Sequence, residues 1–229
     1  SGSSWEDTST ADLPNTNYHI AGQVGETSAS GGRLDVNRDN SVSGSALGGI
    51  VVSTSNIGSL TATDNALNLT SDAKIGQSAY GAYVNASGGG NVSATNNRVL
   101  LDGIGSGEAV TVTTRTGSGD GIFGARIKSA NGSATATGNY VDITAHYGAT
   151  LTLNHGDNGI VGALAEGTDT VSVTGNYVTI TGTDTGTDPS HRLALGTAGT
   201  NAHTLIGGFA LNQTASGSVS GDNTASTLT

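Results

Sequence analysis

Residues 138–144 read Gly-Asn-Tyr-Val-Asp-Ile-Thr and residues 175–181 read Gly-Asn-Tyr-Val-Thr-Ile-Thr, and this repeated stretch decides the fold of the 229-residue chain. In both copies the apolar residues recur at every second position, the period at which the side chains of a β-strand return to one face. If Val141 and Ile143 point inward, Asn139 points inward as well. The stretch therefore predicts a half-buried strand that is preceded by an inward asparagine.

The same unit recurs along the chain with a drifting length. Five glycines that each follow a small or apolar pair are spaced by 32, 43, 38 and 45 residues, namely Gly49, Gly81, Gly124, Gly162 and Gly207. About 14 to 16 residues after each of the first four comes an asparagine: Asn65, Asn97, Asn139 and Asn176. Repeats of this length are typical of solenoids. Each repeat offers at least four short segments with alternating apolar residues, which favours strands over helices.

The composition is consistent with a fold only if equivalent residues stack. The chain has 45 Leu, Ile, Val and Phe residues and 37 Gly, near the boundary below which chains stay disordered. Strands stacked about 4.8 Å apart bury apolar surface without long side chains. We therefore predict an all-β fold, a right-handed parallel β-helix of about 8 to 11 coils of near 20 residues each. The right hand follows from the handedness of crossovers between parallel strands.

Equivalent positions in the repeats predict the inner columns of this solenoid. One column should contain Val99, Val141 and Val178, and the next Leu101, Ile143 and Ile180. The four asparagines should form a buried ladder, and their short amides should tolerate a left-handed backbone at the bend. The residues before them are Asp64, Asn96, Gly138 and Gly175.

The domain organisation follows from where alternation begins. Residues 1–16 show none, and residues 1–19 are expected to form an N-terminal tail or cap, with the first four residues a remnant of cloning. Residues 20–229 are expected to form one continuous run of repeats. Because the last repeat is degraded, we expect this run to be a fragment of a longer protein.

Charge and composition exclude several classes of partner. The chain has 8 Lys and Arg against 18 Asp and Glu and carries a net charge of −10, so no basic stripe is present to bind nucleic acid. No apolar run approaches the roughly 18 residues that cross a bilayer, so no membrane insertion of this segment is expected. The chain has no cysteine, which excludes disulfides and cysteine-bound metals.

Two long segments carry a family resemblance. Residues 121–125 (GIFGA) with 133–144 (SATATGNYVDIT), and residues 159–163 (GIVGA) with 171–181 (VSVTGNYVTIT), resemble the passenger domains of bacterial autotransporter (type V secretion) adhesins. The resemblance covers about residues 20–225. It implies a right-handed parallel β-helix that a C-terminal outer-membrane barrel carries to the cell surface, where it acts in adhesion, aggregation or biofilm formation.

The function expected from this resemblance is that of a non-enzymatic, extracellular adhesin without cofactors. Its partner would be a glycan or protein on a host or bacterial surface. One alternative is a module that associates with copies of itself, and another is a polysaccharide-active β-helix enzyme. For the enzyme, Arg126-Ile127-Lys128 matches a basic tripeptide of polygalacturonase-like hydrolases, but the adjacent aspartates and Gly-His-Gly of that family are absent. We therefore expect an exposed basic pair on a strand.

Metal and nucleophile chemistry find little support in the sequence. The five histidines lack the spacing of zinc ligands, so no metal site is expected, and no GxSxG elbow occurs. Asp120 and Asp157 occupy equivalent places before a Gly-Ile pair and are expected to form turns rather than calcium sites.

One outward strip is the candidate binding site. Arg98, Tyr140 and Tyr177 occupy equivalent positions next to the inward asparagines. Stacked tyrosines suit contact with sugar rings or with another protein. The alternative is that they only stabilise the sheet by stacking across strands.

Overall fold

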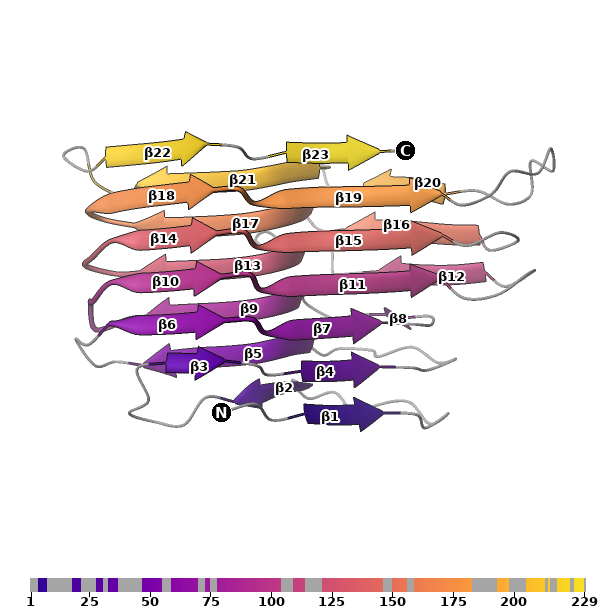
Figure 1. Cartoon of the computed structure of the whole chain (residues 1–229), viewed down its shortest axis with the longest axis horizontal. Coiled ribbons are helices and arrows are strands. Elements are labelled where there is room, and N and C mark those ends of the chain that lie inside the picture. Colours follow the sequence, from indigo (N-terminus) through magenta and orange to yellow (C-terminus); the bar gives the residue numbers. More distant parts are fainter. Residues whose placement is uncertain are drawn as a thin grey trace.

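The protein is all-β over the residues that the structure, a computed structural model, describes (Figure 1). The described residues are 4–7, 18–21, 28–30, 33–36, 47–54, 59–69, 73–74, 78–103, 109–113, 121–145, 150–155, 159–182, 193–197, 205–212, 214, 218–222 and 225–228. Side chains are described at 59–68, 78–101, 121–144, 159–181 and at several positions from 207 to 220. No helix occurs in these segments.

The strands form four sheets, and neighbours within a sheet come from successive repeats. The first sheet has the order β1 (Ser4–Asp7), β4 (Arg33–Val36), β7 (Ala66–Leu69), β11 (Arg98–Gly103), β15 (Tyr140–Ala145), β19 (Tyr177–Gly182) and β23 (Ala225–Leu228). The second has the order β22 (Ser218–Asp222), β18 (Thr170–Thr174), β14 (Ala134–Thr137), β10 (Val92–Thr95), β6 (Leu60–Thr63) and β3 (Ser28–Ser30).

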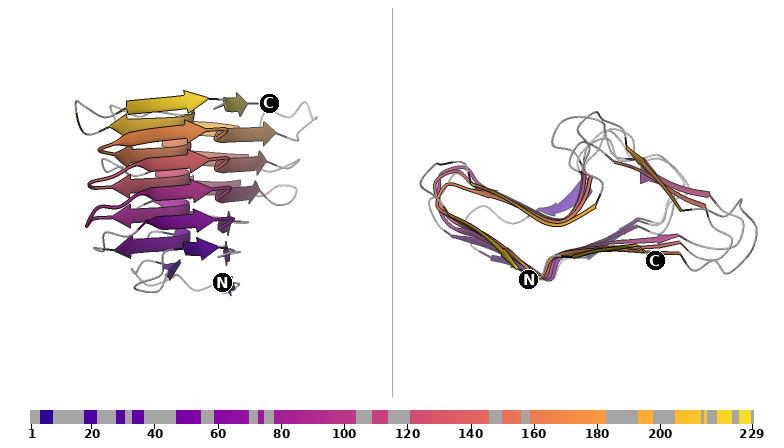
Figure 2. Two further views of the ribbon diagram at one scale, coloured as in Figure 1. Left: turned by 60° about the vertical axis from the view of Figure 1, so that its left-hand side comes forward. Right: turned by 90° about the horizontal axis from the view of Figure 1, so that it is seen from above.

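The other two sheets complete each repeat. The third has the order β20 (Leu193–Thr197), β16 (Thr150–His155), β12 (Ala109–Thr113) and β8 (Ala73–Lys74). The fourth has the order β2 (Tyr18–Ala21), β5 (Leu47–Thr54), β9 (Ala79–Ala86), β13 (Gly121–Ser129), β17 (Gly159–Gly167) and β21 (Leu205–Asn212). Seen along the stacking direction, the strands of each sheet lie over one another (Figure 2).

All pairings between the described strands are parallel, which is compatible with a β-helix. The registers correct the expected coil length. Arg98 pairs with Ala66 and Tyr140, so neighbouring strands are separated by a whole repeat. The expectation of 8 to 11 coils of near 20 residues is therefore wrong, and the longest sheet has seven strands. The physical reason is that one repeat spans four sheets: from β5 to β20, each successive group of four strands supplies one strand to each sheet.

The N-terminal segment contributes strands as well. Strand β1 lies within the expected tail or cap and pairs in parallel with β4, and β2 pairs with β5. Residues 4–7 thus extend the first sheet.

The predicted inner columns are confirmed. Val99, Val141 and Val178 are completely buried and pair with one another in register. The second column is buried to within 3% exposure and consists of Leu101, Ile143 and Ile180. A separate cluster packs small side chains between the second and fourth sheets, and it includes Ala62, Ala94, Ala125, Ala136 and Ala163. Small residues suffice because both walls approach closely and repeat the same contact in every layer.

The asparagine ladder is also confirmed, and all four members are completely buried. The side-chain amide of each donates to the side-chain oxygen of the next, at 2.7 Å from Asn65 to Asn97, 2.8 Å from Asn97 to Asn139 and 2.9 Å from Asn139 to Asn176. The left-handed backbone lies one residue earlier than expected. It occurs at Asp64 (φ 56°), Asn96 (φ 54°), Gly138 (φ 64°) and Gly175 (φ 62°). The preceding residue makes the bend, which leaves the ladder asparagine free to point inward.

The marker glycines lie where the fourth sheet meets the first. A Cβ atom on Gly124 would lie 2.5 Å from the backbone nitrogen and 2.6 Å from the backbone oxygen of Tyr140. Strand pairing passes from Phe123 to Ala125 and skips the glycine, so the alternation of side chains is interrupted there. Phe123, just before the glycine, and Arg126, two residues after it, therefore lie on the same side of the sheet. The Arg126 guanidinium contacts the Phe123 ring. The strands of the fourth sheet are visibly bent (Figure 2).

Candidate functional site

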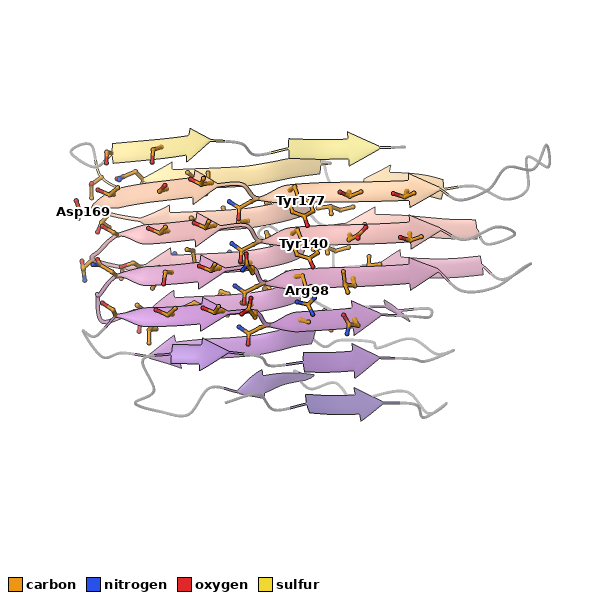
Figure 3. All side chains as sticks on the ribbon, in the orientation of Figure 1. Arg98, Tyr140, Asp169 and Tyr177 are labelled. Carbon is orange, nitrogen blue, oxygen red and sulfur yellow. The ribbon has the colours of Figure 1, made fainter. Side chains whose placement is uncertain are left out.

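The predicted strip on the first sheet is aligned in the structure. Arg98, Tyr140 and Tyr177 pair in register on β11, β15 and β19 and lie one above another (Figure 3). The two tyrosine rings are stacked with centroids 4.8 Å apart and planes at 3°. Smaller residues bound the strip in the same register, with Ala66 on one side and Ala225 on the other. The strip therefore consists of three large side chains, and each comes from a different repeat.

Tyr177 is the most exposed large side chain of this strip, at 37%. Partial burial raises its pKa above the ordinary value of 10.0, and the neighbouring Tyr140 and Asp142 side chains raise it further. Tyr177 is thus neutral at physiological pH. It offers a flat apolar ring and one hydroxyl to a ligand or to another protein.

Arg126 and Lys128 also form contacts beyond those of an exposed basic pair. Lys128 Nζ lies 3.3 Å from one carboxylate oxygen of Glu166, and Arg126 lies 3.8 Å from the other. Glu166 belongs to the next repeat, and its side chain is only 11% exposed. The Glu166 carboxylate is thus paired with two cations, and the side chain of Lys128 is 42% exposed and that of Arg126 24% exposed.

Aromatic rings adjoin these charges on the same side of the fourth sheet. The Arg126 guanidinium carbon lies 5.5 Å from the centroid of the Phe123 ring. Tyr80 stacks on Phe123 at 5.6 Å and on Tyr83 at 5.3 Å between centroids. Phe123, Val161 and Leu164 are almost completely buried beneath this surface and form their own apolar cluster with Tyr80. We call the whole set the bend cluster, and its members are Tyr80, Tyr83, Phe123, Arg126, Lys128, Val161, Leu164 and Glu166.

Tyr83 is electrostatically coupled to the charged part of the bend cluster. Burial raises its pKa above 10.0, Arg126 lowers it, and Tyr80 and Glu166 raise it. The phenol, the guanidinium and the carboxylate therefore influence one another although they come from three different repeats.

Sequence reasoning identified Arg126 and Lys128 but missed the other members of the bend cluster. One signal was available in the sequence, a recurring four-residue pattern. It consists of a large residue, then Gly, then Ala or Gly, then a second large residue. It occurs as Tyr-Gly-Ala-Tyr at 80–83, Phe-Gly-Ala-Arg at 123–126, Val-Gly-Ala-Leu at 161–164 and Ile-Gly-Gly-Phe at 206–209. The partner Glu166 had no signal of its own, because its contact with Lys128 depends on the register between repeats.

The second sheet presents a surface of a different kind. Its outward positions on four successive strands all carry hydroxyl groups: Thr61, Thr63, Ser93, Thr95, Thr135, Thr137, Ser172 and Thr174. These residues are exposed or half-buried, whereas the alternate residues of the same strands are buried. The Ser93 hydroxyl donates to the Thr61 hydroxyl at 3.1 Å. We call this set the hydroxyl face.

Several residues considered from the sequence lie outside the described part of the chain. These are Asp120 and Asp157 in the inter-repeat segments and three of the five histidines. Within the described segments, His, Asp and Glu side chains do not gather in any group of three that could hold a metal ion.

None of the three comparisons with known proteins identifies a relative. Protein-family models, curated proteins and solved structures all give no match. Among the described residues, no helix is long and apolar enough to span a membrane.

Proposed function

We propose that the chain is part of a non-enzymatic adhesin passenger of the autotransporter type, exposed outside the bacterial cell. In this proposal residues 20–229 form a right-handed parallel β-helix that attaches to a glycan or protein on a host or neighbouring cell. The parallel registers support the β-helix. The path of the chain supports the right hand, because it runs one way along the front sheets, returns along the fourth sheet and rises with each repeat (Figures 1 and 2).

The observation that carries the adhesion proposal is the stack of Tyr140 on Tyr177 in register with Arg98. Tyrosine and arginine are the side chains most enriched among contact residues that dominate binding energy. A lateral strip formed by successive repeats favours several weak contacts over one deep site. Adhesion through such a surface would gain strength from avidity.

The experiment replaces the whole strip at once. A variant with Arg98→Ala, Tyr140→Ala and Tyr177→Ala should still fold, since these side chains lie on the surface, but should lose most attachment to cells. The matched control replaces three aligned residues of the hydroxyl face, Thr61→Ala, Ser93→Ala and Thr135→Ala. Attachment is measured with cells displaying each variant, and the melting temperature is recorded in parallel. Unchanged attachment of the strip variant would contradict the role of this strip.

The hydroxyl face favours a second candidate, association with other copies of the same chain. An uncharged, regularly spaced array of hydroxyl groups can pair with an identical array, since each group both donates and accepts. Light scattering after size exclusion should then give a mass that rises with protein concentration. The Thr61→Ala, Ser93→Ala and Thr135→Ala variant should remain monomeric at concentrations where the natural chain associates. A constant monomeric mass for the natural chain would rule this candidate out.

A further inference from the structure

We propose that the bend cluster is a saccharide-binding site, distinct from the tyrosine strip of the first sheet. The inference rests on the proposed adhesin function for its biological setting and adds a ligand class and a location to it. The site lies on the side of β9, β13 and β17 that faces away from the core. Ala125 and Ile127 point into the core there, while Arg126 and Lys128 alternate with them and remain partly exposed.

The base of the site is apolar and fully packed. Phe123 is completely buried, Val161 is 2% exposed and Leu164 is 4% exposed. Above this base, Tyr80 and Tyr83 are half-buried, so part of each residue reaches the surface. Stacking of Tyr80 on both Tyr83 and Phe123 limits the freedom of the rings before any ligand arrives. A preorganised aromatic surface loses little conformational entropy on binding.

Polar groups converge beside this aromatic surface. Lys128 and Arg126 contribute donors, and Glu166 contributes acceptors, within the two ion pairs of 3.3 and 3.8 Å. Asn85 lies in the same column as Lys128 and Glu166 on the neighbouring strands. Apolar walls with a few convergent polar groups are the usual makeup of a small-molecule site.

The combination fits a pyranose sugar better than other ligand classes. A pyranose has an apolar face of C–H groups that packs on an aromatic ring, and a rim of hydroxyls that both donate and accept hydrogen bonds. The strands repeat about every 4.8 Å, which is comparable with the length of one sugar unit in a chain. A nucleic acid would meet a chain of net charge −10, which opposes its approach.

The test uses the two lysines of the chain, Lys74 and Lys128, as reporters. The natural chain is titrated by calorimetry with oligosaccharides of chitin, cellulose and alginate, and is then acetylated with an amine-reactive reagent at saturating oligosaccharide. Mass spectrometry of peptides gives the extent of labelling at each lysine. Binding in this cluster predicts protection of Lys128, while Lys74 on β8 of the third sheet is labelled as in the free protein.

Single-residue variants test which side chains of the bend cluster contribute to the affinity. Tyr83→Ala should weaken binding roughly tenfold, the change that corresponds to about 1.4 kcal/mol of lost ring contact. Tyr83→Phe keeps the ring and should restore most of the affinity. Glu166→Gln should weaken binding although it changes the side-chain volume little. Thr144→Ala, on β15 of the first sheet, should leave the affinity unchanged. The melting temperature of each variant identifies any that is merely unfolded.

Three results would overturn the proposal. These are no binding of any of the three oligosaccharides, equal labelling of Lys128 with and without bound oligosaccharide, or full affinity in a folded Tyr83→Ala variant. The adhesin proposal is tested separately, because cell attachment that depends on Arg98, Tyr140 and Tyr177 would stand in each of these cases.

Discussion

The side-chain amide of Asn97 donates a 2.8 Å hydrogen bond to the side-chain oxygen of Asn139, and both residues are completely buried. The same oxygen of Asn139 also accepts the backbone N–H of Asn97 at 3.0 Å. The Asn139 amide in turn donates to the Ala94 carbonyl at 3.0 Å and to Asn176 at 2.9 Å. The carboxamides of Asn97 and Asn139 are thus fully paired, and each of the two joins three layers of the fold.

Replacing Asn139 with Ala should lower the free energy of unfolding by roughly 3 kcal/mol or more, because several buried groups lose partners of about 1–3 kcal/mol each. The groups that lose a partner are the Asn97 side-chain amide and backbone N–H, the Ala94 carbonyl and the Asn176 oxygen, and the last of these keeps the backbone N–H of residue 139. Thr135→Ala, on the exposed hydroxyl face, is the control and should change stability by about 0.5 kcal/mol or less. Denaturant unfolding measures both. Equal effects of the two changes would show that the ladder contributes no particular stability.

The assignment of faces predicts opposite outcomes for two aspartate substitutions in equivalent strands. Val141 is completely buried, so Val141→Asp should cost several kcal/mol or unfold the region, because the carboxylate would have no partner. Thr179 lies on the half-buried outer side, and Thr179→Asp should change stability little. Thermal unfolding compares the two. A larger decrease in melting temperature for Thr179→Asp would mean that the faces are reversed.

Gly124 should tolerate no side chain. A Cβ there would lie 2.5 Å from the Gly162 carbonyl oxygen as well as against the Tyr140 backbone, and backbone atoms of two other strands cannot rotate away. Gly124→Ala should therefore cost about 3 kcal/mol or more. Denaturant unfolding gives the value.

Gly175 is the matched control for this glycine, because only its backbone angle is special. Its φ is 62°, and Asn96 occupies the equivalent position with φ 54°. Gly175→Asn should therefore change the free energy of unfolding by only about 1 kcal/mol. A stable Gly124→Ala variant would contradict the close contact between the two walls.

Alkaline pH should destabilise the fold through Tyr83 and Tyr177. Both have a folded-state pKa above the ordinary 10.0, so the unfolded chain ionises first as the pH rises. The stability from these residues is fully present below about pH 10 and is lost as the pH rises through the higher folded pKa. Denaturant unfolding over this range measures the loss. Tyr83→Phe and Tyr177→Phe should each make the decline shallower, and a decline that stays the same in both would contradict the prediction.

The stack of Tyr140 on Tyr177 should contribute coupling energy. With centroids 4.8 Å apart, a double-mutant cycle to Ala should give an interaction of about 0.5–1.5 kcal/mol. Arg98 and Tyr177 lie on strands that are not neighbours and serve as the control pair, for which the interaction should be near zero. No coupling between the tyrosines would mean that stacking of the two rings adds nothing to stability, contrary to the prediction.

The sequence by itself determined which residues face inward within one repeat. Alternation is a local property of a strand, so Val141, Ile143 and Asn139 could be assigned to one face without knowledge of any other strand. Equivalence between repeats then placed Arg98, Tyr140 and Tyr177 in one outward register.

Only the tertiary structure decided how far apart the paired strands lie in the chain and what gathers at the bend. The number of sheets to which one repeat contributes depends on how its strands pack around the core. A pairing partner about 20 residues away could therefore not be distinguished from one 32 or more residues away before the registers were known. At Gly124 the wall of the first sheet comes so close that the local alternation is broken, and Phe123 and Arg126 come to share a side. Glu166 meets Lys128 through the register between two repeats, and this contact depends on strand pairing that no single repeat encodes.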